Sequence, residues 1–207
     1  MLTEVEKPTK ENHLDVEQKV QKVRELYADA SDFGKAALEK ALPGLRRELA
    51  AASVAQNAGR VGARQGKVSE LTAILPFAEG GAKRLRGLLQ LLGANFKGAD
   101  AVGSLHDMRF VFLDNDTKLL FATAYDGDWD PYIDDFVTRI PEALDLLLCN
   151  LEGYPGINSP SVKDWIVKHQ VTAEAWYVAN PDLTVAETRR LQRIGKAADE
   201  FLDKVGD

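Results

Sequence analysis

The stretch Leu105-His106-Asp107-Met108-Arg109-Phe110-Val111-Phe112-Leu113, then Asp114-Asn115-Asp116 and then Thr117 to Tyr125, decides the fold class. Two runs rich in β-branched and aromatic residues flank three turn-forming residues, which is typical of a β-hairpin. The hairpin runs directly into Asp126-Gly127-Asp128-Trp129-Asp130-Pro131. This second segment predicts a turn and then a helix that Asp130 caps and Pro131 opens. We therefore expect two antiparallel strands that lead into a helix.

The composition is that of a globular protein, with 45% hydrophobic and 28% charged residues. The net charge of -6 is unevenly placed. Met1 to Val68 holds 12 basic and 10 acidic residues, whereas Ser69 to Asp207 holds 14 and 22. Because the acidic second part repels polyanions, we do not expect nucleic acid as a partner.

The chain has no long apolar run, and Met1 to Asn12 is charged and polar. From these features we expect no membrane insertion, no secretory signal and a cytoplasmic location. The single cysteine, Cys149, excludes an intrachain disulfide and suits a reducing compartment. It follows the apolar helix pattern of Leu144 to Leu148, which predicts a buried side chain.

Residues 1–68 are predicted to be a helical N-terminal extension with a linker. One helix should begin after Asp15, and a second after Asp32, which Pro43-Gly44 should kink or divide. Residues 57–67 mix glycines with basic residues and are expected to be a linker or mobile loop.

Residues 69–207 are predicted to form an α+β domain with a C-terminal helix. The expected order is strand, helix, strand, strand, helix, strand, with Trp176 to Ala179 as the last strand. This is the split βαβ order of a ferredoxin-like fold with an antiparallel sheet. A closing helix follows, marked by the capping box of Thr184 and Glu187. One face of such a sheet stays open and must meet another layer, either helices or a second copy of the sheet.

In this element order, residues 69–179 resemble the dimeric α/β-barrel (ferredoxin-like) superfamily. Its members include antibiotic-biosynthesis-type monooxygenases and dye-decolourising peroxidases, in which two sheets pack face to face around a cavity. The resemblance implies a homodimer, a small-molecule site on the open sheet face and oxidoreductase chemistry. The resemblance also implies haem as a candidate cofactor.

Strand alternation predicts that Asp107 and Arg109 share one face of the first hairpin strand, while His106 and Phe110 share the other. The aromatic face should lie on the helices, so Asp107 and Arg109 should look toward the open side. There they can orient a polar or anionic ligand, the Arg through its planar donor fork. An ordinary ion pair near a strand end is the alternative.

Two histidines are candidates for chemistry. His106 can act as a general base or a ligand, or it can be a partly buried structural side chain. His169, between Trp165 and Trp176, is the candidate haem ligand, with a surface position as the alternative. The three histidines lack metal-like spacing, so a zinc site is not expected.

The segment from Thr123 to Gly127 resembles the G-x-x-D-G motif of dye-decolourising peroxidases, although Thr123 replaces its first glycine. The resemblance implies a catalytic role for Asp126, and turn and cap chemistry is the alternative explanation. Tyr125 is expected to flank a pocket mouth or to pack under the helix. Because successive strand residues alternate faces, one of Trp176 and Tyr177 should face the open side, and Trp176 is the candidate ligand-binding residue.

The sequence thus favours a small-molecule-binding protein, and the resemblance implies an enzyme of peroxidase or monooxygenase type. In this hypothesis Asp107, Arg109, Tyr125 and Trp176 bind the ligand, and Asp126 or His106 moves protons. The alternative is a non-catalytic binding or assembly module whose open sheet face is sealed by helices or by a partner subunit.

Overall fold

A computed structural model of the chain describes residues 15–51, 56–93 and 97–206. The chain divides into two compact units, Met1–Val54 and Ala55–Asp207. The first unit is a helical hairpin, and the second contains the sheet and the remaining helices. Each unit is described by itself below.

The hairpin consists of α1 (Val16–Leu26) and α2 (Asp32–Ala51). Asp15 caps α1 as expected, in a reciprocal capping box with Gln18. Ser31, rather than Asp32, caps α2, because its Oγ accepts a hydrogen bond from the Gly34 N–H. The predicted division at Pro43 is wrong, since α2 continues through it. The buried contact between the helices comes from Val20, Leu38 and Leu42.

The second unit is built on a five-stranded antiparallel sheet of order β1-β2-β3-β5-β4. Its strands are β1 (Gln56–Asn57), β2 (Ala63–Gln65), β3 (Val68–Pro76), β4 (Leu105–Leu113) and β5 (Lys118–Asp126). The predicted hairpin is confirmed as β4 and β5. Its turn residues Asp114, Asn115 and Asp116 all have positive φ, a conformation that Asp and Asn tolerate better than most residues. The fold is therefore α+β with an antiparallel sheet, as predicted.

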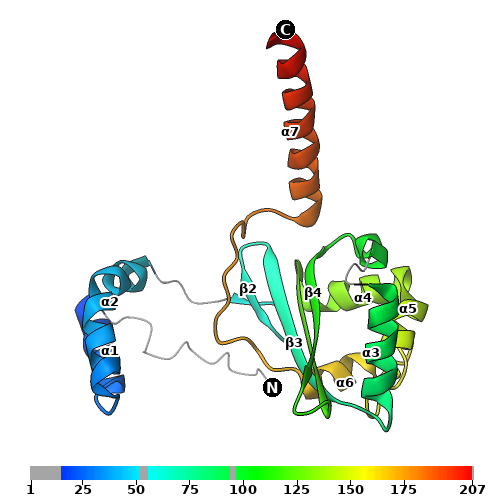
Figure 1. The fold of residues 1–207 in the computed structure, drawn as a ribbon, viewed down its shortest axis with the longest axis horizontal. Helices are drawn as coiled ribbons and strands as arrows, with labels where there is room; N and C mark the ends of the chain where they lie inside the picture. Colours follow the sequence, from blue (N-terminus) through cyan, green and yellow to red (C-terminus); the bar gives the residue numbers. More distant parts are fainter. Residues whose placement is uncertain (1–14, 52–55, 94–96, 207) are drawn as a thin grey trace, which may run out of the picture. The chain divides into compact units, whose positions relative to one another are not determined.

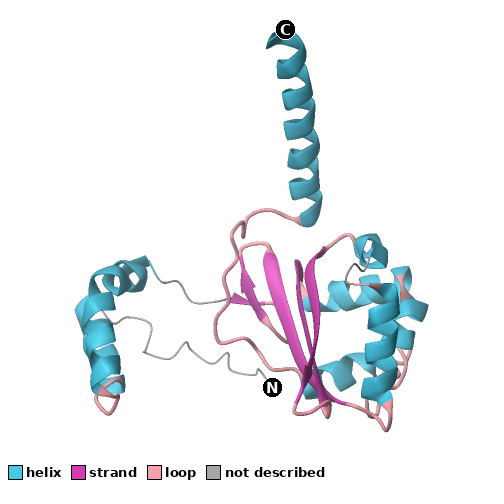
Figure 2. Cartoon of the chain, in the orientation of Figure 1, coloured by secondary structure: helices cyan, strands magenta, loops and turns pink. Residues whose placement is uncertain are grey.

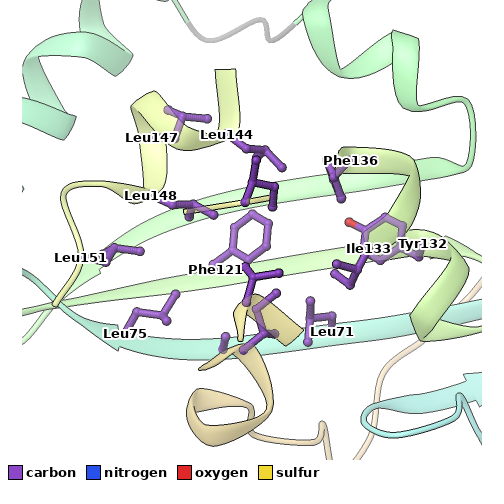
Figure 3. Close-up of a cluster of buried hydrophobic side chains, with 14 of the residues drawn as sticks. Leu71, Leu75, Phe121, Tyr132, Ile133, Phe136, Leu144, Leu147, Leu148 and Leu151 are labelled. Atoms are coloured by element: carbon purple, nitrogen blue, oxygen red, sulfur yellow. The ribbon is translucent and has the colours of Figure 1, made fainter. Parts of the chain in front are cut away.

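Helices cover one face of this sheet (Figure 1). They are α3 (Gly81–Leu92), α4 (Trp129–Arg139), α5 (Pro141–Leu148) and α6 (Val162–His169). A 3-10 helix, η2 (Lys97–Val102), precedes β4. Buried side chains of the central strands, such as Leu71 and Phe121, pack against Phe136 and Leu144 of the helices (Figure 3). This single apolar layer is the core of the unit.

Two expectations about connecting segments are wrong. Residues 57–67, expected as a linker, belong to β1, β2 and their connection. Residues 176–179 form no strand; the chain instead meets the free edge of β3 earlier, where the Val171 N–H donates to the Thr72 carbonyl. We call residues 170–184 the strap; most of it is loop (Figure 2).

The start of α4 and the end of α5 also differ from expectation. The N-cap position of α4 is Asp128, so Pro131 lies inside the first turn rather than at its first residue. Cys149 is exposed, not buried, because it is the C-cap of α5 and not part of the apolar stripe. The closing helix, α7 (Val185–Gly206), begins at the predicted capping box.

Candidate functional site

The sheet face opposite α3 to α6 carries a row of small side chains between polar ones. The central strand β5 places Ala122 and Ala124 on this face. In register, Arg109 and Thr72 flank Ala122, while Asp107 and Glu70 flank Ala124. We call this surface the open face. On this face, the small side chains of two alanines are thus bordered by charged and hydroxyl groups.

Asp107 and Arg109 lie where the alternation placed them and form an ion pair of 2.9 Å between Arg109 Nε and Asp107 Oδ2. The pair is solvent-exposed, with 64% of the Arg109 side chain and 48% of the Asp107 side chain accessible. An exposed pair of this kind contributes little stability. Because the contact uses Nε, the terminal nitrogens of the guanidinium extend beyond the pair and can donate to an anion.

His106 lies on a different face from the one predicted. A β-bulge between Leu105 and Asp107 interrupts the alternation, so His106 does not join Phe110 under the helices. Its Nε2 lies 2.6 Å from Oδ1 of Asp126, the last residue of β5. The structure thus brings together the two residues proposed to move protons.

The environment of Asp126 orients this pair. Its Oδ2 accepts a hydrogen bond from the Val185 N–H, at the first residue of α7, at 3.0 Å. Only 16% of the Asp126 side chain and 25% of the His106 side chain are exposed. When Nε2–H of neutral His106 donates to Asp126, Nδ1 keeps its lone pair. A carboxylate that fixes an imidazole in this way prepares it to accept a proton.

Glu70 is a buried carboxylate that the sequence reading missed. It is 4% exposed, and its Oε1 accepts hydrogen bonds from the N–H groups of Ala63 and Ala173 at 3.0 and 3.1 Å. Its Oε2 accepts a bond from the Thr72 hydroxyl at 3.1 Å. Glu70 therefore joins β2 and the strap to β3 at the border of the open face. A Glu in a strand gives no sequence signal for this role, because one N–H donor lies on the neighbouring strand and the other, from Ala173, is distant in the chain.

The other acidic residues of the Asp126 segment have structural partners. Asp128 pairs with Arg64 at 2.6 Å, and Asp130 pairs with Lys163 at 3.0 Å. Among the described residues no group of three His, Cys, Asp or Glu side chains could hold a metal ion. Local turn and helix-start chemistry, together with these ion pairs, therefore accounts for most of this acidic run.

Tyr125 is fully buried and does not reach the open face. Its ring stacks on Tyr132 of α4 with a centroid separation of 3.8 Å. Burial, with a further contribution from the charge of Glu70, raises the pKa of Tyr125 above its usual range. The phenol oxygen of Tyr125 is buried without a hydrogen-bond partner among the described residues. Tyr125 is therefore a core residue in this structure, which is the second of its two expected positions.

Trp176 and His169 lie on different elements from His106 and Asp126, which are on β4 and β5. Trp176 is on the strap, where its backbone carbonyl accepts a bond from Gln65 Nε2 at 2.8 Å. His169 ends α6 on the helix-covered side, with Nδ1 2.8 Å from the Trp165 carbonyl. This contact leaves the lone pair of His169 Nε2 available, as in metal-bound histidines.

A haem also needs an apolar hollow wide enough for the macrocycle. The enclosed apolar cavity between the sheet and α4 to α6 has a volume of about 30 Å³, close to that of one water molecule. Leu71, Phe121, Phe136 and Trp165 are among its lining residues, and His169 is not. This apolar cavity therefore neither reaches His169 nor has room for a haem.

Comparison with protein-family models, with curated proteins and with solved structures gave no match. Among the described helices, none is both long and apolar enough to cross a membrane. The candidate site consequently rests on its own geometry: the open face, the exposed guanidinium of Arg109 and the oriented imidazole of His106.

Proposed function

We propose that this protein binds a small organic anion on the open face and exchanges a proton with it through His106. The observation that carries the proposal is the contact of 2.6 Å between His106 Nε2 and Asp126 Oδ1. An imidazole held by a carboxylate and still partly accessible is a common arrangement for general acid–base chemistry.

Each polar group of the site has a separate task in this proposal. Arg109 binds the carboxylate or phosphate of the ligand through the outer nitrogens of its fork, and Asp107 holds the guanidinium in place. Ala122 and Ala124 leave room for the body of the ligand. Nδ1 of His106 takes a proton from the ligand, while Asp126 stabilises the imidazolium that forms.

The fold that we propose is ferredoxin-like, in a homodimer of the dimeric α/β-barrel type. The ferredoxin-like proposal is supported by the antiparallel order β3-β5-β4, in which α3 connects β3 to β4. These elements match the strand, helix, strand, strand that begin the ferredoxin-like order. In place of a regular last strand, the strap contacts the free edge of β3. A second sheet packed on the open face would cover Val111, which is 44% exposed, and exclude water from the site.

An oxidative reaction of the monooxygenase kind is the finer proposal that follows from this resemblance. The residues of the open face supply only the proton-transfer part of such a reaction, in which the substrate is deprotonated and then oxidised by molecular oxygen as the co-substrate. We route no step through haem, because the apolar cavity beneath the sheet has no room for it and does not reach His169.

The proposal is tested by titrating the protein with benzoate, salicylate and succinate and following its backbone amides by NMR. We expect saturable shifts at Asp107, Arg109, Ala122 and Ala124. Arg109→Gln should weaken binding by about tenfold or more, because a charge-assisted hydrogen bond is lost. The matched control is Arg139→Gln, which removes an exposed guanidinium paired with Asp135 on α4.

Two results would contradict the proposal. One is a set of shifts that lies away from these strands for every acid. The other is an equal effect of Arg109→Gln and Arg139→Gln on affinity. His106→Gln should leave the affinity for these anions nearly unchanged, because Arg109 and not His106 binds the anion in this proposal.

A second candidate function is a non-catalytic assembly module. It is favoured by the large apolar side chains that α7 exposes, among them Phe201 at 64% and Val205 at 67%. If the protein binds none of the tested anions at the open face but does self-associate, this candidate is favoured over the first.

A further inference from the structure

The first turn of α7 is attached to the end of β5, beside the His106–Asp126 pair. The N–H of Val185, the first residue of α7, donates to Asp126 Oδ2 at 3.0 Å. The other oxygen, Oδ1, lies 2.6 Å from His106 Nε2. Val185 is 7% exposed, so few water molecules can replace its N–H as the donor. The helix and the imidazole therefore share one carboxylate.

This arrangement lets the helix decide how the carboxylate of Asp126 is turned. The bond between Cβ and Cγ of an aspartate rotates over a broad range when nothing holds the carboxylate. A hydrogen bond to Oδ2 limits this rotation and so fixes the position of Oδ1 against His106. The Val185 N–H is available as the donor, because the first N–H groups of a helix have no partner within the helix. The positive end of the α7 dipole also stabilises the negative carboxylate.

Lys67, Thr184 and Glu187 hold the start of α7 in this place, and we call them the clip. Lys67 Nζ donates to both carboxylate oxygens of Glu187, at 2.8 and 2.9 Å. The same carboxylate accepts hydrogen bonds from the N–H and the hydroxyl of Thr184. The Lys67 N–H donates to the Pro181 carbonyl at 2.7 Å, and the Lys67 carbonyl accepts the Gly127 N–H at 2.9 Å. Since Gly127 directly follows β5, Lys67 ties the helix start to that strand end.

The attachment of α7 to the described part of its unit is confined to the start of the helix. Arg189 adds an ion pair of 2.7 Å with Asp100. From residue 190 to residue 205 every residue is exposed. Packing farther along the helix therefore cannot offset a change at the clip.

We propose that the first turn of α7 positions the His106 imidazole, with Glu187 as a positioning residue that acts through Asp126. This inference rests on the proposed function, because it concerns how the proposed base is held. While the clip is intact, Asp126 keeps the proton of His106 on Nε2, and Nδ1 is free to accept another. When the clip is broken, the carboxylate can rotate and the imidazole loses its fixed orientation. Proton exchange with the ligand then falls, although Arg109 still binds the ligand.

The first test removes the hydrogen bond from α7 itself. Proline is favoured at the first position of a helix, so Val185→Pro deletes the N–H donor and should preserve α7. NMR of the free protein follows the proton on Nε2 of neutral His106. Its exchange with water should be about tenfold faster in Val185→Pro, because Asp126 loses a charge-assisted hydrogen bond that keeps it in place. Val185→Ala keeps the N–H and is the matched control, with nearly unchanged exchange.

The second test breaks the clip at a distance from Asp126. Lys67→Gln removes the ion pair with Glu187, and Lys67→Arg should restore wild-type behaviour. In Lys67→Gln the Val185 amide and the His106 Nε2 proton should exchange faster together, by up to about fivefold, as expected for an exposed ion pair. Lys196→Gln removes a lysine farther along α7 and should change neither rate. Faster exchange at Val185 without faster exchange at His106 overturns the proposal.

The outcomes separate this inference from the proposed function. If wild-type His106 has a protected Nε2 proton whose exchange is the same in Val185→Pro, this inference alone is overturned. If wild-type His106 has no protected proton on Nε2, the proposed function is contradicted as well. Benzoate should bind Val185→Pro with the wild-type affinity, because Arg109 binds the anion in that proposal.

Discussion

Replacing Glu70 should detach the strap and destabilise the sheet unit, although Glu70 is a single polar residue in a strand. Its carboxylate accepts two backbone N–H bonds, from Ala63 and Ala173, and one hydroxyl bond from Thr72. In Glu70→Ala both N–H groups lose their acceptor at a position where the carboxylate itself is 4% exposed.

The magnitude follows from these contacts. A buried donor left without a partner costs about 1–3 kcal/mol, so two of them cost about 2–6 kcal/mol. Removal of a buried carboxylate recovers part of this cost through desolvation, which leaves about 3 kcal/mol. For a domain of this size that is a fall in Tm of about 6–12 °C. Glu70→Gln keeps one acceptor oxygen for the N–H groups and should cost about 1 kcal/mol.

Urea unfolding followed by tryptophan fluorescence measures this effect, because Trp129, Trp165 and Trp176 all belong to the sheet unit. Amide exchange should also accelerate at Ala173 more than at residues within α4. Thr72→Val is the matched control, since it removes only the hydroxyl bond. A free energy of unfolding for Glu70→Ala within about 0.5 kcal/mol of the wild type, the usual range of a surface substitution, would refute the reasoning.

Two further predictions concern the start of α7 and the glycines. The hydrogen bond from Lys67, with further bonds from Thr184, lowers the pKa of Glu187 to about 2; its contribution to stability should therefore be complete above the ordinary carboxyl value of 4.5 and be lost as pH falls toward 2. Thermal unfolding between pH 6 and pH 2 should show a flatter acid limb for Glu187→Gln, and an unchanged limb would contradict this. Gly62 has a φ of +84°, and a Cβ there would lie 2.0 Å from the Glu70 carbonyl oxygen, so Gly62→Ala should destabilise strongly. Gly87→Ala, inside α3 with open space around it, should instead raise stability by about 0.5–1 kcal/mol, and calorimetry of both variants checks the contrast.

Local signals predicted the elements that depend on neighbouring residues. The hairpin of β4 and β5, the cap at Asp15 and the capping box at Thr184 each rest on residues within a few positions of one another. The placement of Asp107 and Arg109 on the open face followed from strand alternation, which holds on the C-terminal side of the bulge.

Features that depend on distant contacts could not be predicted in this way. Alternation fails at the bulge, so His106 was assigned to the wrong face, and no residue pattern there distinguishes a bulge from a regular strand. The strap meets β3 at Gln170 and Val171 rather than at Trp176, because bonds to Glu70 and Thr72 decide where it attaches. These contacts join residues about a hundred positions apart, beyond the reach of any local propensity.

The central claim is that Asp126 orients His106 so that Nδ1 is its free proton acceptor. Long-range ¹H–¹⁵N NMR spectra of the neutral imidazoles measure this directly, because they distinguish the two tautomers of each histidine. His106 should carry its proton on Nε2, and His169, whose Nδ1 contacts the Trp165 carbonyl, provides an internal reference of the opposite kind with its proton on Nδ1. A proton on Nδ1 of His106, or an equal mixture of its tautomers, would contradict the account.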